Sequence, residues 1–160
     1  MDINSDNLRT FFPALLTSGD DEDYERFCQL LRPRKLAAGE ALVRRGGRSG
    51  ALSLVVHGRL AVALNGPAGA MPLGETGSGS WVGELSLIRP ANAQADVVAT
   101  ADTLLWELRH DDFEQLRREH PRSASRLLQT LCQSLVIRLR RSSDRVLALA
   151  REGQGPSGIV

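Results

Sequence analysis

Hydrophobic residues recur with a helical period near both ends of the chain and with a strand-like pattern in the middle. Near the N-terminus, apolar residues follow an acidic run at helical spacing, which predicts a helix over residues 20–31. An earlier apolar cluster predicts a short helix that packs on the same core. The apolar residues are Tyr24, Phe27, Leu30 and Leu31 in the helix, and Phe11, Phe12, Leu15 and Leu16 in the earlier cluster.

Between residues 34 and 108, short apolar runs alternate with closely spaced glycines, as in a β-sandwich or β-roll. The runs ALSLVV and RLAVAL are separated only by His57 and Gly58, which predicts a two-residue β-hairpin. The runs ADVVAT and TLLWEL predict two more strands. The turn-rich segment NGPAGAMPLGETGSGS predicts a loop at the rim, with one short strand around residues 71–73.

Helical spacing returns after residue 110. Asp111 and Asp112 are expected to cap a helix over FEQLRREH, and Pro121 is expected to break or restart the helix. A second, long helix is predicted over about residues 122–151. It carries an apolar stripe formed by Leu128, Leu131, Leu135, Leu139 and Val146. Because one roll is too short to cover this apolar stripe, we expect a homodimer through paired, parallel C-terminal helices.

The chain of 160 residues is long enough for one domain with a proper core. We divide it into an N-terminal helical segment (1–33), a β-roll (34–110), C-terminal helices (111–151) and a flexible tail (152–160). The predicted fold class is α+β, mainly β.

Composition narrows the function only slightly. The net charge of +1 predicts neither nucleic-acid nor membrane binding, and no apolar run is long enough to span a bilayer. The N-terminus does not resemble a secretion signal, so a cytoplasmic protein is expected. Cys28 and Cys132 form no C-x-x-C motif and are interpreted as buried, reduced thiols. His57, His110 and His120 have no metal-ligand spacing, so no metal site is expected.

Four motifs in sequence order carry a family resemblance: AAGEALVRRGG, LSLVVHGRLAVAL, GSWVGELSLI and ADVVATADTLLWEL. Together they resemble the cyclic nucleotide-binding domain of catabolite-activator-like regulators, cyclic-nucleotide-dependent kinases and channels. The similarity extends over roughly residues 11–149. It implies a β-roll or jelly roll with N-terminal helices and a long C-terminal helix.

The resemblance also implies a binding cassette at residues 83–97, which in that family holds the cyclic phosphate and ribose. There the glutamate of the Gly-Glu-Leu motif accepts a hydrogen bond from the ribose 2′-hydroxyl, and an arginine pairs with the phosphate. In this chain, an alanine stands where the family carries that arginine, and a glutamine follows it. The candidate cassette residues are Gly83, Glu84, Leu85, Ser86, Ala93, Gln94 and Ala95.

The missing arginine predicts weak or lost cyclic nucleotide binding. A charge-assisted hydrogen bond contributes roughly 1.5–3 kcal/mol, so its loss weakens binding about ten- to several-hundred-fold. Gln94 is a candidate neutral donor to the phosphate. Arg89 is a candidate cationic replacement, although a solvated turn residue is the favoured interpretation of Arg89. Glu84 also has two interpretations, as a ribose ligand or as a first-turn acid that the helix dipole favours.

These observations predict a non-catalytic regulatory domain, with cyclic AMP and cyclic GMP as candidate ligands and no cofactor. The alternative is a ligand-independent module for protein–protein interaction or dimerisation. An enzyme is not expected, because no catalytic triad can be identified. The basic segment Arg138–Arg145 could bind nucleic acid or an acidic lipid, but the favoured interpretation is the solvated flank of the long helix, pairing with acids such as Glu152 or with a partner. Because few residues follow the long helix, a DNA-reading helix-turn-helix domain is not expected.

Overall fold

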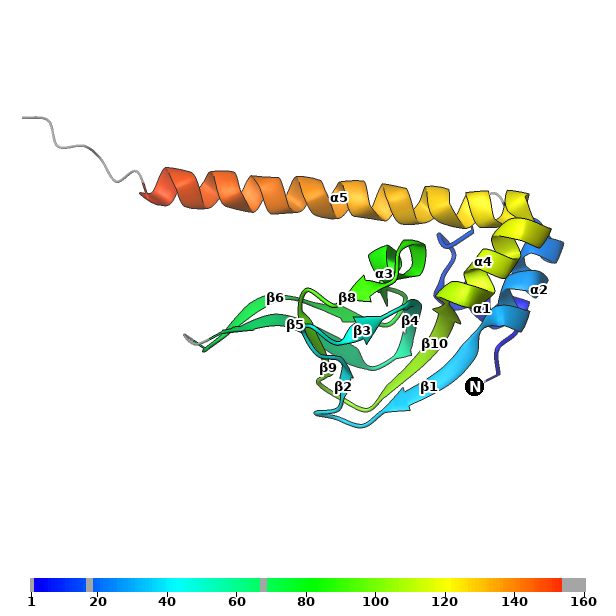
Figure 1. Cartoon of the computed structure of the whole chain (residues 1–160), viewed down its shortest axis with the longest axis horizontal. Helices are drawn as coiled ribbons and strands as arrows, with labels where there is room; N and C mark the ends of the chain where they lie inside the picture. Colours follow the sequence, from blue (N-terminus) through cyan, green and yellow to red (C-terminus); the bar gives the residue numbers. More distant parts are fainter. Residues whose placement is uncertain (1, 17–18, 67–68, 154–160) are drawn as a thin grey trace, which may run out of the picture.

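The computed structural model describes residues 2–16, 19–66 and 69–153. Two short helices precede the strands, another interrupts them, and two follow, the last of which runs along one side of the molecule (Figure 1). The helices are α1 (Ser5–Phe11), α2 (Asp21–Leu30), α3 (Glu84–Ile88), α4 (His110–Glu119) and α5 (Pro121–Gly153). The strands are β1 (Arg32–Leu36), β2 (Ala41–Val43), β3 (Arg48–Ser49), β4 (Ala51–His57), β5 (Arg59–Gly66), β6 (Gly69–Gly77), β7 (Trp81–Val82), β8 (Ala91–Asn92), β9 (Asp96–Ala99) and β10 (Thr103–Arg109).

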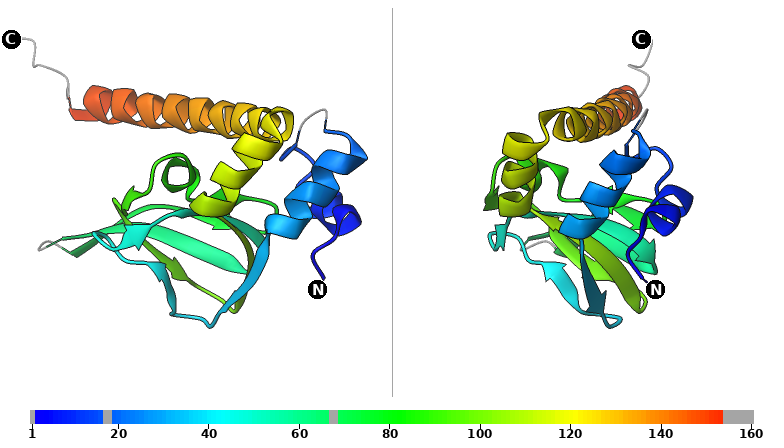
Figure 2. Two further views of the ribbon diagram at one scale, coloured as in Figure 1. Left: turned by 45° about the vertical axis from the view of Figure 1, so that its right-hand side comes forward. Right: turned by 90° about the vertical axis from the view of Figure 1, so that its right-hand side faces the viewer.

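The strands form a roll of two antiparallel four-stranded sheets and a small ribbon. One sheet has the order β1-β10-β4-β7, the other has the order β2-β9-β5-β6, and the ribbon pairs β3 with β8. The helices α1, α2 and α4 gather at one end of the roll, and α5 extends back over it (Figure 2). The predicted fold, a β-roll with N-terminal helices and a long C-terminal helix, is confirmed.

The predicted hairpin at His57 and Gly58 is wrong, because the chain passes there from one sheet to the other. β4 pairs with β10 and β7, whereas β5 pairs with β6 and β9. Gly58 has a φ of +96°, and a Cβ added to it would lie 2.4 Å from Thr103 Oγ1. The glycine therefore serves a sheet corner that lies tightly against β10.

β6 is a full strand, although the sequence predicts a loop with a short strand around residues 71–73. It pairs with β5 along its length, and the ladder ends with Gly66 opposite Gly69. β6 is the outer strand of its sheet, a position that tolerates a proline such as Pro72. Pairing with β5 thus outweighs the poor strand propensity of the segment.

The first helix begins earlier than the apolar cluster at residues 11–16 predicts. The side chain of Asn4 caps α1 by accepting a hydrogen bond from the Asn7 N–H at 2.8 Å. The rest of the cluster follows the end of α1, where Phe12, Leu15 and Leu16 are buried. The cluster therefore predicts the core correctly and the helix wrongly.

α4 also begins earlier than expected. Arg109 is its N-cap residue, so Asp111 and Asp112 lie in the first turn and do not cap the helix. Their carboxylates remain favourable there, because they face the positive end of the helix dipole. Pro121 restarts the helical structure, one of the two roles expected of it, because it is the first residue of α5.

The larger hydrophobic core joins the helices to the sheet that contains β4 and β10. Trp106 of β10 is fully buried, and its ring centroid lies 6.3 Å from that of Phe11 and 6.1 Å from that of Phe12. Leu127 and Leu131 bring the first half of α5 into the same core. A smaller core lies within the roll and contains Leu36, Val55, Leu60, Val97, Ala99 and Leu105.

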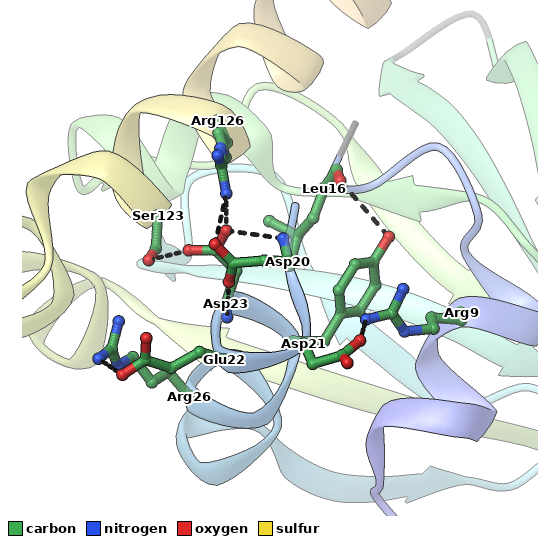
Figure 3. A network of polar contacts seen from close by, with 10 residues as sticks. Arg9, Leu16, Asp20, Asp21, Glu22, Asp23, Arg26, Ser123 and Arg126 are labelled. Atoms are coloured by element: carbon green, nitrogen blue, oxygen red, sulfur yellow. Dashed lines mark hydrogen bonds and ion pairs between the residues drawn. The ribbon is translucent and has the colours of Figure 1, made fainter. Parts of the chain in front are cut away.

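A buried carboxylate fixes the beginning of α5 to α2 (Figure 3). Asp20 and Asp23 form a capping box at the start of α2, with the Asp23 N–H donating to Asp20 at 2.9 Å. The Asp23 side chain, almost completely buried, also accepts hydrogen bonds from Ser123 and Arg126 of α5. This Asp23 network satisfies a charge that would otherwise be costly to bury.

The apolar stripe of α5 divides into a packed part and an exposed part. Leu131 is buried, and Leu128 and Leu135 are half-buried. Leu139 and Val146, further along the helix, are 68% and 63% exposed. The chain itself therefore covers only the first half of the stripe.

Both cysteines are free, but only partly as expected. Cys28 is half-buried in α2, where burial and the nearby Glu25 carboxylate raise its pKa to about 11. Cys132 is exposed on α5, so its interpretation as a buried thiol is wrong.

Across residues 2–16, 19–66 and 69–153, no helix combines the length and apolar character that a bilayer crossing requires. α5 extends to Gly153, two residues beyond the predicted end of the helix. The rest of the predicted flexible tail, residues 154–160, lies outside the described residues.

Candidate functional site

A cavity of about 800 Å³ is lined by the roll, α3, the β3–β8 ribbon and the middle of α5. In Figure 1, α3 lies between the roll and α5. The volume is within the usual range for small-molecule sites. All seven candidate cassette residues line this cavity: Gly83, Glu84, Leu85, Ser86, Ala93, Gln94 and Ala95.

Gly83 sets the path of the chain into the cavity wall. Its φ is +91°, and a Cβ there would lie 2.2 Å from the Ala51 carbonyl oxygen. Its own carbonyl accepts a hydrogen bond from the Leu87 N–H at 2.9 Å, which closes the short helix α3. Leu87 is completely buried and holds α3 against the core, whereas Leu85 is 58% exposed at the cavity.

Glu84 is buried and already paired. Only 4% of the residue is exposed, and its carboxylate forms an ion pair with Arg138 of α5. Arg138 also donates to the Trp81 carbonyl oxygen at 3.2 Å and to Ser134 Oγ at 3.4 Å. For Arg138, whose side chain is 46% exposed, the acid that the solvated flank was expected to pair with is Glu84.

The second half of the cassette is held by backbone contacts and by one carboxylate. The Ala93 N–H donates to the Gly47 carbonyl at 2.8 Å, and the Gly46 N–H donates to the Ala93 carbonyl at 2.8 Å. Asp96 then accepts from the backbone N–H of Arg45 at 2.7 Å. This hydrogen bond, helped by one from Asn65, holds the pKa of the Asp96 carboxyl below its ordinary value.

The polar side chains proposed as replacements for the missing arginine are exposed and, in the part of the chain that the structure describes, unpaired. Arg89 and Gln94 are both exposed, and Arg89 follows directly on the end of α3. Within the described residues, neither side chain makes a hydrogen bond or ion pair. Both line the cavity, so either side chain is placed to contact a ligand there.

A second ion pair in the lining lies on the roll. Arg34 of β1 is 3.1 Å from Glu107 of β10, and Glu107 also accepts from the Ser53 hydroxyl at 3.2 Å. The side chain of Glu107 is 17% exposed. Within this pair, as within the Glu84–Arg138 pair, the positive and negative charges offset each other. Both carboxylates, Glu84 and Glu107, are therefore paired.

The described residues contain no group of three His, Cys, Asp or Glu side chains that could hold a metal ion. His110 instead links α4 to α3, because its Nδ1 lies 2.6 Å from the Leu87 carbonyl oxygen.

Residues 33–120 match the family model for the cyclic nucleotide-binding domain. The chain belongs to the cyclic nucleotide-binding domain family. It is 29% identical over 117 residues to the cAMP-dependent protein kinase regulatory subunit of Blastocladiella emersonii. That alignment covers 72% of this chain but only 29% of the regulatory subunit, so the chain corresponds to less than a third of that relative.

Solved structures of other cyclic nucleotide-binding domains have the same fold. A domain from Methylobacillus flagellatus superposes with a TM-score of 0.80 at 23% identity, covering 98% of this chain and 88% of that one. The catabolite activator protein of Thermus thermophilus superposes with a TM-score of 0.74 at 25% identity, covering 86% of this chain and 63% of that one. These superpositions confirm the fold of a cyclic nucleotide-binding domain.

The contact that sequence reasoning missed is the one between Glu84 and Arg138. The two residues are 54 positions apart. A basic run at the surface of a predicted helix contains no signal that singles out one arginine as the partner of a buried acid. Only the direction of α5 across the cavity selects Arg138.

Proposed function

We propose that this domain is a non-catalytic regulatory module whose cavity binds cyclic nucleotides weakly or not at all. The observation that carries the proposal is the state of the two cassette charges. The carboxylate that would contact a ribose, Glu84, is held by Arg138, and Ala93 occupies the place of the phosphate-binding arginine.

Both features act against a cyclic nucleotide. Without a guanidinium at position 93, the phosphate loses a contact of roughly 1.5–3 kcal/mol. A ribose hydroxyl must also share or displace the Arg138 guanidinium at Glu84. If the hydroxyl displaced Arg138, the buried carboxylate of Glu84, a residue only 4% exposed, would exchange a charged partner for an uncharged one. This exchange is unfavourable for a buried charge.

The same contact offers a route for regulation. Arg138 belongs to α5, so any ligand that binds Glu84 competes directly with a residue of the long helix. The beginning of α5 is fixed by the Asp23 network, whereas the part beyond Leu135 has mostly exposed apolar residues. We infer that a bound ligand changes the position of this second half, and that a second copy of the chain pairs with it.

The test is a calorimetric titration with cyclic AMP and cyclic GMP of the native chain and of Ala93→Arg. The native chain is expected to bind weakly or undetectably. Ala93→Arg is expected to tighten binding about tenfold or more, because it restores the phosphate contact. Ala91→Arg is the matched control, since it adds the same charge two residues earlier on the cavity lining and should not reproduce the gain.

Two outcomes contradict the proposal. Micromolar or tighter binding of cyclic AMP by the native chain shows that position 93 does not limit affinity. Failure of a folded Ala93→Arg chain to bind either nucleotide shows that the cassette no longer accepts them. The second outcome favours the alternative function, a ligand-independent interaction module, which the exposed Leu139 and Val146 already support.

A further inference from the structure

The cavity contains more positive charge than its ion pairs use. Five arginines and three acids line it. Two of the arginines are neutralised, Arg34 by Glu107 and Arg138 by Glu84. The other three are Arg48, Arg89 and Arg109, and within the described part of the chain their side chains form no hydrogen bond or ion pair.

The three unpaired arginines come from chain segments that meet around Gly50. Arg48 lies two residues before Gly50 on β3. Arg89 precedes Pro90, whose Cβ would be 3.8 Å from a Cβ at Gly50. Arg109 lies opposite Ala51, the neighbour of Gly50, and the next residue along donates its N–H to the Gly50 carbonyl at 2.8 Å.

This arginine group, Arg48, Arg89 and Arg109, is also next to the changed part of the cassette. Arg48 of β3 lies opposite Asn92 of β8 in the ribbon register. Asn92 immediately precedes Ala93, which exchanges backbone hydrogen bonds with the residues before Arg48. A cation is therefore available from the neighbouring strand, beside the position that lacks its arginine.

The surroundings leave the group with a net positive charge. Asp111, at the start of α4, is the remaining acid of the lining. Asp112, the next residue, is taken by Arg32 at 3.3 Å. His110 is occupied by its contact with the Leu87 carbonyl. One carboxylate thus faces three guanidinium groups, all on exposed residues that can turn toward a ligand.

We propose that the cavity binds a nucleotide that carries a terminal phosphate, with the phosphate held by Arg48, Arg89 and Arg109. A cyclic phosphodiester has one negative charge and needs one guanidinium at position 93, where this chain has alanine. A terminal phosphate carries more negative charge and several acceptor oxygens, which suit several arginines acting together. The proposal rests on the proposed function, because it assigns a ligand class to the same cavity.

The test is a calorimetric titration of the full chain at low ionic strength with ATP, AMP, cyclic AMP and inorganic pyrophosphate. ATP is expected to bind about tenfold or more tightly than cyclic AMP, and its affinity should fall as salt is added. Arg48→Gln, Arg89→Gln and Arg109→Gln should each weaken ATP binding about tenfold. Arg122→Gln is the matched control: it removes an exposed arginine outside the cavity lining and should leave the affinity unchanged.

The outcomes separate this proposal from the proposed function. Absent ATP binding, tighter binding of cyclic AMP than of ATP, or ATP affinity unchanged by all three substitutions overturns the arginine group as a phosphate site. Pyrophosphate binding as tight as that of ATP overturns the nucleotide as the ligand. A gain of cyclic AMP binding in Ala93→Arg supports the proposed function whichever of these results is obtained.

Discussion

The two halves of α5 are similar in sequence and opposite in environment. From Pro121 to Leu135 the helix packs on its own chain, with Leu127 and Leu131 completely buried. From Val136 onward, large apolar residues continue at the same density, yet Leu139 is 68% exposed. One helix therefore combines a structural element of the domain with a surface that the domain does not cover, and Arg138 lies just beyond the boundary between them.

The largest expected effect is the difference in the free energy of unfolding when a leucine is truncated in the first or in the second half of α5. Leu131→Ala should lower the free energy of unfolding by about 2–5 kcal/mol, because it opens a cavity in the larger core. Leu139→Ala removes the same atoms from an exposed position and should lower the stability of the isolated chain far less. Urea unfolding of both variants at low protein concentration measures the difference. Equal losses would mean that the second half is also packed within the chain.

The next effect concerns the attachment of the first half. Asp23→Ala should lower the free energy of unfolding by about 1.5–3 kcal/mol, because it leaves the buried Ser123 hydroxyl without its acceptor and removes the ion pair with Arg126. Asp21→Ala is the control, since it removes the neighbouring acid, whose side chain is 93% exposed. If thermal unfolding shows the two variants to be equally stable, the Asp23 network does not anchor α5.

A third effect tests what covers the second half. Light scattering is expected to show a species of twice 17.4 kDa for the native chain and a shift to the monomer for Leu139→Glu. Ile137→Glu places the same charge two residues earlier, about 200° around the helix, and should leave the dimer intact. A native monomer at tens of micromolar concentration would refute a dimer through the apolar stripe.

The last comparison concerns the reactivity of two thiols, and it involves the smallest change to the protein, since neither stability nor assembly is altered. At pH 8, Cys28, with its pKa raised to about 11, is expected to be ionised to roughly one part in a thousand, whereas an ordinary exposed thiol is ionised to roughly a quarter. Cys132, exposed on α5, should therefore react with iodoacetamide at least about a hundred times faster. Mass spectrometry of a labelling time course identifies the modified residue. Comparable rates would show that α2 opens readily.

Local sequence signals predicted the parts of this fold that depend on neighbouring residues. The acidic start of α2, the strand character of the apolar runs and the length of α5 all follow from short-range patterns. The same signals failed where a partner far along the chain decides the structure. In the sequence, Gly58 indicates a change of chain direction. Only the pairing of β4 with the distant strand β10 makes that change a corner between two sheets.

The candidate site divides in the same way. The cassette residues were identified by resemblance and all lie on one cavity. The charge balance of that cavity was not predictable, because it depends on arginines from β1, β3, β10 and α5. Arg138 illustrates the reason: its partner Glu84 is chosen by the path of a helix across the roll, which leaves no trace in either local sequence.

Gly83 has a further consequence for how such chains are classified. Any side chain at this position would collide with the Ala51 carbonyl, 2.2 Å from the Cβ, and would be strained at a φ of +91°. A roll built in this way needs the glycine even if its cavity never meets a nucleotide. A sequence motif that treats this glycine as evidence of ligand binding therefore mistakes a residue that the fold requires for a residue that the ligand requires. Position 93, where alanine is accommodated without strain, is the more informative test of whether a family member still holds a cyclic phosphate.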